Sequence, residues 1–184
     1  MNLQQLSQIG ILGVGDYIPD HSMSNDDFIQ RGIDTSHEWI KSRSGIENRC
    51  IASNEQKTSD LATNAAKNAL KSAGLTADDL DFIIVATATP DHYGFPSTAC
   101  LVQQKIGIQR NIPCFDVSAA CSGFAYALNI AYSKISCGLG TIGLVIGSES
   151  LSSIIDWSDR RSCILFGDGA GAALVGPVST GGFI

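Results

Sequence analysis

The hydrophobic positions of the chain form short apolar runs, and segments with helical spacing separate these runs. The runs are rich in β-branched residues, which is typical of strands that are buried in a sheet. Predicted strands cover residues 8–19, 81–89, 111–118 and 141–150. Predicted helices cover residues 24–32, 35–43, 58–74, 97–107 and 121–138. Strands that alternate with helices in this way predict an α/β domain built in layers.

The helix expected over residues 58–74 has the clearest pattern. Thr58 or Ser59 is expected to cap its N-terminus, and Gly74 is expected to end it. One stripe of its surface is apolar and consists mostly of alanine: Leu61, Ala62, Ala65, Ala66, Ala69, Leu70 and Ala73. Because these side chains are small, the helix is expected to pack very close to the layer that it covers.

Charge is sparse along the chain. Charged residues make up only 16% of it, against 44% hydrophobic residues, which suggests that another domain or an oligomer interface covers part of the surface. The net charge of −6 argues against nucleic acid as a bulk partner. Two groups of basic residues leave room for a local anionic ligand: Lys41, Arg43 and Arg49, and Arg160 with Arg161.

Six cysteines lie at irregular spacings, without a Cys-X-X-Cys pair and without a cluster that includes histidine. Most have apolar neighbours, where cysteine behaves as a small hydrophobic residue. We therefore expect free thiols in a reducing compartment, with neither disulfides nor a metal site. The first residues show no basic leader pattern, and no apolar run approaches the ~20 residues of a membrane span. These features predict a cytoplasmic protein without membrane contact.

Glycine-rich runs invite comparison with nucleotide-binding loops. Gly13 and Gly15 lack the third glycine of the Gly-X-Gly-X-X-Gly pattern, and a turn is expected after them instead of a helix. The run at 167–171 lacks the Lys-Ser/Thr pair of a phosphate loop, and we expect it to form the turn between two short strands in residues 162–178. Tight packing and turns explain both runs, and no dinucleotide site is predicted.

Cys121 stands where the predicted strand over residues 111–118 gives way to a helix. A helix N-terminus stabilises negative charge, so a thiol at this position ionises more easily. Its neighbours are all small: Ala119, Ala120, Ser122 and Gly123. They leave room for a substrate carbonyl, and the backbone N–H of Cys121 is placed to face the oxyanion that forms on attack. This pattern favours a nucleophile, and a buried core cysteine is the alternative.

The segment DVSAACSGFAYAL around Cys121 resembles the nucleophile segment of the β-ketoacyl-[acyl-carrier-protein] synthase III family, condensing enzymes that initiate type II fatty acid synthesis. Four further segments follow the family pattern: DTSHEWIKSRSGIENRCIA, DFIIVATATPD, FPSTAC and DRRSCILFGDGAGAALV. Together they span nearly the whole chain. The resemblance implies a thiolase-like fold, of which residues 1–184 form the N-terminal α/β half-domain, a mixed sheet covered by helices.

The resemblance also implies a role for individual residues. Cys121 would be acylated by an acyl-CoA primer such as acetyl-CoA. Coenzyme A would be bound by Thr35, Trp39, Arg43 and Arg160. Trp39 and Arg43 would hold the adenine ring between an aromatic face and a flat guanidinium. Phe95 would reach across a homodimer and limit the partner's acyl pocket. Because acyl-CoA is a substrate, the resemblance implies no resident cofactor.

Family members are about twice as long as this chain, and their catalytic histidine and asparagine lie in the second half. Most of the basic residues that dock the acidic carrier protein lie there too. We therefore expect the 184-residue chain alone to manage at most the acylation step. Condensation with malonyl-acyl carrier protein is expected to need a second half, without which one sheet face and the central helix would be exposed.

Three alternatives stay open. Besides a synthase III half-domain, the chain could be a related coenzyme A-dependent acyltransferase (hydroxymethylglutaryl-CoA synthase-like or from secondary metabolism). It could also be a non-catalytic partner subunit, or a hydrolase with a Cys121–His92 dyad. The dyad is considered because His92 follows the strand over residues 81–89, where α/β sheets often carry functional groups. Retention of the whole SAACSG segment argues against a mere partner subunit, because a scaffold needs no thiol there.

Overall fold

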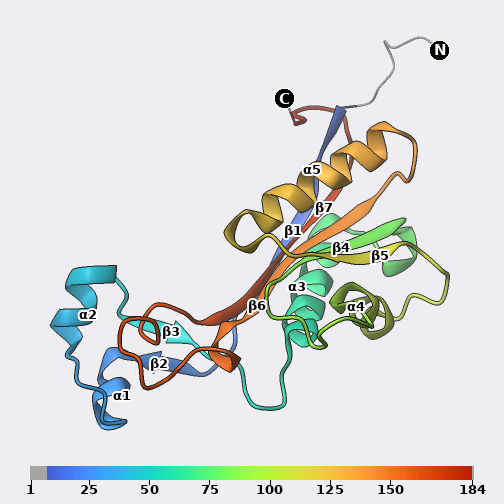
Figure 1. The fold of residues 1–184 in the computed structure, drawn as a ribbon. Helices are drawn as coiled ribbons and strands as arrows, with labels where there is room; N and C mark the ends of the chain where they lie inside the picture. Colours follow the sequence, from blue (N-terminus) through green and yellow to red (C-terminus); the bar gives the residue numbers. More distant parts are fainter. Residues whose placement is uncertain (1–7, 184) are drawn as a thin grey trace.

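The computed structural model describes residues 8–183 and builds them around a five-stranded sheet (Figure 1). In spatial order the strands are β1 (Gln8–Tyr17), β7 (Asp168–Val178), β6 (Gly143–Ser150), β4 (Phe82–Ala86) and β5 (Cys114–Val117). β4 pairs in parallel with β5 and β6, whereas β7 runs antiparallel to β6 and β1. The predicted α/β class with a mixed sheet is confirmed.

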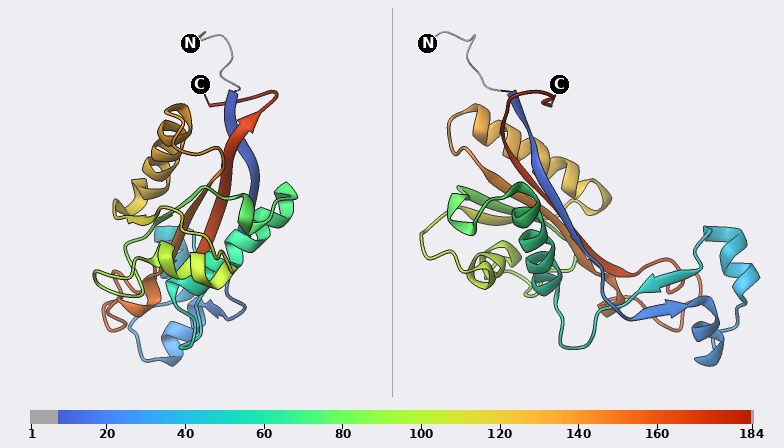
Figure 2. Two further views of the ribbon diagram at one scale, coloured as in Figure 1. Left: turned by 90° about the vertical axis from the view of Figure 1, so that its right-hand side faces the viewer. Right: turned by 180° about the vertical axis from the view of Figure 1, so that it is seen from behind.

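Helices cover both faces of this sheet. α3 (Thr58–Ala73) and α4 (Thr98–Ile106) pack on one face, and α5 (Gly123–Ser136) packs on the other. The left view of Figure 2 shows α5 on one side of the strands and α3 on the other. The apolar cluster under α3 and α4 is the larger of the two. On the opposite side, Tyr126 and Tyr132 of α5 remain exposed.

The alanine stripe of α3 packs as its sequence predicts. Ala65 and Ala69 are fully buried against β1. A Cβ atom added to Gly15 would lie 2.2 Å from the backbone N of Ala69 and 2.5 Å from the backbone O of Ala65. No side chain fits between the helix and the strand at this point, so the two backbones are in direct contact.

The predicted cap of α3 is wrong. The N-cap residue is Lys57, and the carboxylate of Asp60 accepts a hydrogen bond from its backbone N–H at 3.0 Å. The hydroxyl of Ser59 instead donates to Asp91 at 2.6 Å, and the hydroxyl of Thr58 donates to the backbone O of Thr89. Both hydroxyls tie the start of α3 to the loop after β4, a long-range pairing that a local pattern does not reveal.

Residues 20–51 form an arm that projects from the end of the sheet (Figures 1 and 2). It consists of β2 (Ser22–Ser24), α1 (Asn25–Gln30), α2 (His37–Ser44) and β3 (Asn48–Cys50). The two helices and the Ser24 cap of α1 were predicted, whereas the antiparallel pairing of β2 with β3 was not. A small core holds the arm to the segment that follows β6: Met23, Phe28, Ile40, Cys163 and Ile164.

The buried guanidinium of Arg49 links these parts. It donates to the backbone O of Met23 at 3.2 Å, to the Asn25 side chain at 2.8 Å and to the backbone O of Ile164 at 3.0 Å. Burial lowers the pKa of Arg49. Lys41 is paired with Glu47 at 2.6 Å. Of Lys41, Arg43 and Arg49, only Arg43 therefore has neither an ion pair nor a side-chain hydrogen bond among residues 8–183.

Two further predictions need correction. Residues 162–178 contain one strand, β7, and the apolar residues before it form turns whose Cys163 and Ile164 fill the core of the arm. The cysteines are all free, but only Cys163 is buried, and Cys100, Cys121 and Cys137 are exposed.

In the described part of the chain, none of the helices is long and apolar enough to cross a bilayer.

Candidate active site

Cys121 lies in a tight turn between β5 and α5. The strand ends at Val117, a short 3-10 helix follows at Ala120–Ser122, and α5 begins at Gly123. The predicted junction of strand and helix is confirmed, although the thiol sits two residues before the α-helix. Ala120 has a φ angle of 45°, in the left-handed region that costs a residue with a side chain about 1 to 3 kcal/mol. This turn presents the Cys121 side chain to solvent.

A cavity of 260 Å³ opens in front of Cys121. Small residues from three strands line much of it: Ala86 of β4, Gly147 and Ser148 of β6, and Gly169, Ala170 and Gly171 of β7. Phe124 from the first turn of α5 adds one aromatic side chain. A thioester carbonyl can approach the sulfur across this lining, because little side-chain bulk stands in the way.

Glu149 also lines this cavity, and sequence reasoning missed it. Its carboxylate accepts a hydrogen bond from the backbone N–H of Ala88 at 2.8 Å and another from the Thr89 hydroxyl at 2.5 Å. The Thr87 hydroxyl adds a longer contact at 3.4 Å. Glu149 therefore fixes the loop after β4 to the end of β6, with its oxygens already engaged. Glu149 is the last residue but one of β6, and its neighbours in sequence give no sign of this long-range contact.

His92 lies in the exposed loop between β4 and α4. It is not among the residues that line the cavity of Cys121, and no hydrogen bond joins the two side chains within the described chain. The cavity lining contains no histidine at all. The geometry thus gives the Cys121–His92 dyad no support.

Three of the residues expected to bind coenzyme A come together on the arm. The guanidinium carbon of Arg43 lies 4.3 Å from the centre of the Trp39 ring, and that of Arg160 lies 5.0 Å from it. Arg160 reaches Trp39 from the segment after β6 and is held by the Asp34 carboxylate at 3.0 Å. Thr35 is adjacent in sequence, and its buried hydroxyl has no hydrogen-bond partner among residues 8–183.

The spacing around Trp39 is too narrow for an adenine ring. Two stacked contacts of about 3.5 Å each need about 7 Å between the Trp39 ring and a guanidinium. Either arginine would have to swing away before a purine could enter. Arg43 is exposed and has no carboxylate partner within residues 8–183, whereas Arg160 is tied to Asp34. Arg43 is therefore the arginine that moves at the lower cost.

Phe95 occupies the loop between β4 and α4 and is 92% exposed, beside Tyr93 at 93%. It does not contribute to the cavity of Cys121 in its own chain. Large aromatic side chains this exposed are unusual on a free surface and are typical of protein contacts.

Comparison with known proteins identifies the relatives of this chain. The family model for 3-oxoacyl-[acyl-carrier-protein (ACP)] synthase III matches residues 115–184, which include Cys121 and Arg160. β-Ketoacyl-[acyl-carrier-protein] synthase III of Neisseria meningitidis is 53% identical over 174 residues, which are 95% of this chain and 54% of that protein. This chain belongs to the synthase III family.

Solved structures of synthase III relatives agree with the fold. The 3-oxoacyl-[acyl-carrier-protein] synthase III of Aquifex aeolicus superposes with a TM-score of 0.88 at 49% identity, covering 94% of this chain and 55% of that one. The priming β-ketosynthase from the R1128 polyketide pathway gives 0.88 at 34% identity, with 98% and 54% covered. The predicted thiolase-like fold is confirmed. The chain spans about half the length of the synthase III relatives that it matches.

Proposed function

We propose that this chain carries the acyl-accepting site of a synthase III condensing enzyme in fatty acid synthesis. The observation that carries the proposal is the exposed thiol of Cys121, held by a strained turn in front of a cavity lined by small residues. A strained turn is maintained at a cost to stability, and such strain is concentrated at functional sites. Membership in the synthase III family supports acylation as the reaction of this thiol.

In the proposed first step, the Cys121 thiolate attacks the thioester carbonyl of an acyl-CoA primer such as acetyl-CoA. A carbon–sulfur bond to Cys121 forms, the bond to coenzyme A breaks, and the coenzyme A thiolate leaves and takes up a proton from water. The start of α5 supports this step, because its unpaired N–H groups stabilise the thiolate and the oxyanion.

The arm is proposed to bind the adenine end of coenzyme A. Trp39 supplies the flat apolar face, and Arg43 swings out so that the purine stacks between ring and guanidinium. Arg160 remains anchored by Asp34 at the rim. The buried hydroxyl of Thr35 has no partner of its own in the described chain, so it is proposed to hydrogen-bond to the entering group once the movement of Arg43 exposes it.

Condensation is proposed to require groups beyond these residues. A carbanion formed when malonyl-acyl carrier protein loses carbon dioxide would attack the acyl group on Cys121, releasing the thiolate and a 3-oxoacyl product. Glu149, the acidic residue at the cavity, is fully hydrogen-bonded, and His92 lies outside the cavity. We therefore assign acylation to this chain and decarboxylation to a second half, with Phe95 contributed across a homodimer.

The intact mass of the 184-residue chain after incubation with acetyl-CoA tests the acylation step. We expect one acetyl adduct, absent from Cys121→Ser and retained in Cys137→Ser, a matched control whose thiol is also exposed. Trp39→Ala should keep the adduct but require more acetyl-CoA to reach half-maximal labelling. Adduct formation in Cys121→Ser, or none in a chain with a native circular dichroism spectrum, would contradict the proposal.

A further inference from the structure

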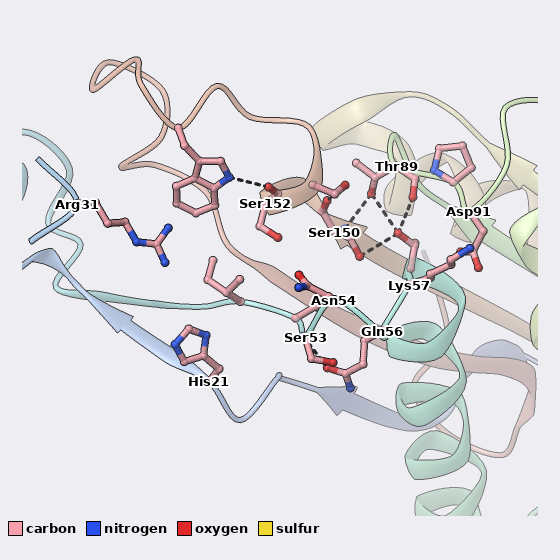
Figure 3. Close-up of a pocket in the computed structure, with 16 residues that line it drawn as sticks. His21, Arg31, Ser53, Asn54, Gln56, Lys57, Thr89, Asp91, Ser150 and Ser152 are labelled. Carbon is pink, nitrogen blue, oxygen red and sulfur yellow. Dashed lines mark hydrogen bonds between the residues drawn. The ribbon is translucent and has the colours of Figure 1, made fainter. Parts of the chain in front are cut away.

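A second and larger cavity, of 660 Å³, lies by the start of α3 and shares no lining residue with the cavity of Cys121 (Figure 3). Ser150 lines it, and the Ser150 and Ser148 hydroxyls bond to Thr58 at the start of α3. Cys121 opens toward α5 instead. The cavity is bounded by the arm, the segment between β3 and α3, the loop after β4 and the segment after β6. Its volume is typical of sites for small molecules.

Basic and amide side chains with no partner surround this cavity. Figure 3 shows His21 and Arg31 directed into it from the arm, Asn54 at its centre and Lys57 on the far side. Within residues 8–183, the side chains of these four residues take part in no ion pair and no hydrogen bond, although the backbone N–H of Lys57 donates to Asp60. The cavity therefore offers several donors that are accessible to a solute.

The acidic residue of the lining does not neutralise these cations. Both oxygens of Asp91 accept hydrogen bonds from Ser59, from its backbone N–H at 2.8 Å and from its hydroxyl at 2.6 Å. The amine of Lys105, 2.6 Å from the Ser59 hydroxyl, is paired with the Asp60 carboxylate at 2.7 Å and adds no unpaired charge. Against Asp91, the lining carries the cations Arg31 and Lys57, so its formal net charge is +1 with His21 neutral, in a chain whose net charge is −6.

Arg31 rests on a fixed support. Its guanidinium carbon lies 5.1 Å from the centre of the Trp157 ring. The Trp157 indole N–H donates to the backbone O of Ser152 at 3.1 Å, and its ring stacks on Phe28 at 6.2 Å. An arginine stacked in this way presents the edge of its guanidinium to a ligand at a reduced entropic cost.

We propose that this cavity binds a small molecule through a phosphate group. Cationic groups that approach from separate sides suit a tetrahedral dianion with several acceptor oxygens better than a single carboxylate. Asn54 and the Ser53 hydroxyl line the cavity and supply neutral hydrogen bonds beside them, whereas the hydroxyls of Ser152 and Ser153 already donate within the protein. The proposal goes beyond the proposed function and shares no residue with the Cys121 or Trp39 sites, so either can fail without the other.

Tryptophan fluorescence provides the test, because the chain has two tryptophans and Trp39→Phe leaves only Trp157 at the cavity. Inorganic phosphate is titrated at constant ionic strength. We expect a saturable change in Trp157 emission, with the apparent Kd raised about tenfold by Arg31→Gln or by Lys57→Gln, since each removes a charge-assisted hydrogen bond. Lys67→Gln, an exposed cation of α3 outside the cavity, should leave the Kd unchanged.

A linear response, equal affinities in all variants, or acetate binding as tightly as phosphate would overturn the proposal. Should Trp39→Phe fail to fold, 31P line broadening of phosphate with the unsubstituted chain, Arg31→Gln and Lys67→Gln gives the same comparison. In a second titration, coenzyme A is added to Trp39→Phe in the presence of phosphate. Its competition with phosphate in Trp39→Phe would identify a phosphate of the coenzyme as the source, and phosphate binding without competition would identify a separate metabolite.

Discussion

The two faces of the central sheet differ in how completely they are covered. Under α3 and α4, the side chains of Ile83, Val85 and Leu174 are fully buried. On the α5 side, Val14 of β1 is 59% exposed, and it borders an apolar groove beside Phe124. The closed face supplies the burial that stabilises the fold. The open face carries the exposed Cys121 thiol and the strained turn, so stability and proposed chemistry are assigned to opposite sides of one sheet.

Cysteine shows the same contrast within one residue type. The Cys114 side chain packs into the closed face, where burial and the neighbouring Cys100 raise its pKa to about 12. Cys121 is exposed on the open face. The same functional group is therefore half-buried in one layer and accessible in the other, and the difference in exposure comes from packing.

The largest expected effect is at the contact of β1 with α3. Gly15→Ala places a methyl group within 2.2 Å of the Ala69 backbone N, so helix and strand must separate. We expect a loss of about 3 kcal/mol in the free energy of unfolding, measured by urea denaturation. The matched control is Gly171→Ala on the open side, where no atom lies within 4 Å of the added Cβ. It should change stability by less than about 0.5 kcal/mol, and equal effects would contradict the distinction between the faces.

The closed face is also the part that the sequence predicted well. The alanine stripe of α3 and the apolar run at residues 81–89 are local patterns, and each correctly indicated a buried element. The alanine pattern of α3 did not indicate that the helix packs against Gly15, because Gly15 is separated from Ala69 by more than fifty residues. Around Cys121, the small residues correctly indicated a turn from strand to helix, because such a turn is encoded by neighbours, whereas the role of the thiol as a nucleophile stays a prediction.

The features that were missed depend on contacts between distant segments. Strands β2 and β3 are three residues each and pair across the whole of α1 and α2, too short for periodicity to register. Cys163 and Ile164 were predicted in a strand because they are apolar, yet they fill the arm. Glu149 gave no local hint that it would join the loop after β4. Whether each cysteine is exposed likewise depends on packing between distant segments, which local patterns do not reveal.

A second, smaller effect concerns pH. Because folding raises the pKa of Cys114, the unfolded chain loses the thiol proton at a lower pH than the folded chain does. The contribution of the protonated thiol to the free energy of unfolding is therefore complete below pH 9 and is lost progressively up to about pH 12. Because the thiol is only half-buried and solvent screens it, the loss at pH 10 relative to pH 8 is at most about 1 kcal/mol. Cys114→Ala should therefore flatten the fall in unfolding free energy between these pH values. Cys137→Ala, which removes an exposed thiol, should leave the slope unaltered.

The smallest expected effect concerns the strain next to Cys121. Ala120 has a φ angle of 45°, which glycine adopts without a steric penalty, whereas Ala119 has an ordinary φ of −143°. Ala120→Gly should stabilise the chain by about 1 kcal/mol, and Ala119→Gly should destabilise it by about 0.5 kcal/mol, both measured by urea denaturation. Destabilisation by both substitutions would show that the turn stores no strain. Stabilisation by Ala120→Gly together with slower acetylation of Cys121 would show that the open face gives up stability to hold the thiol in place.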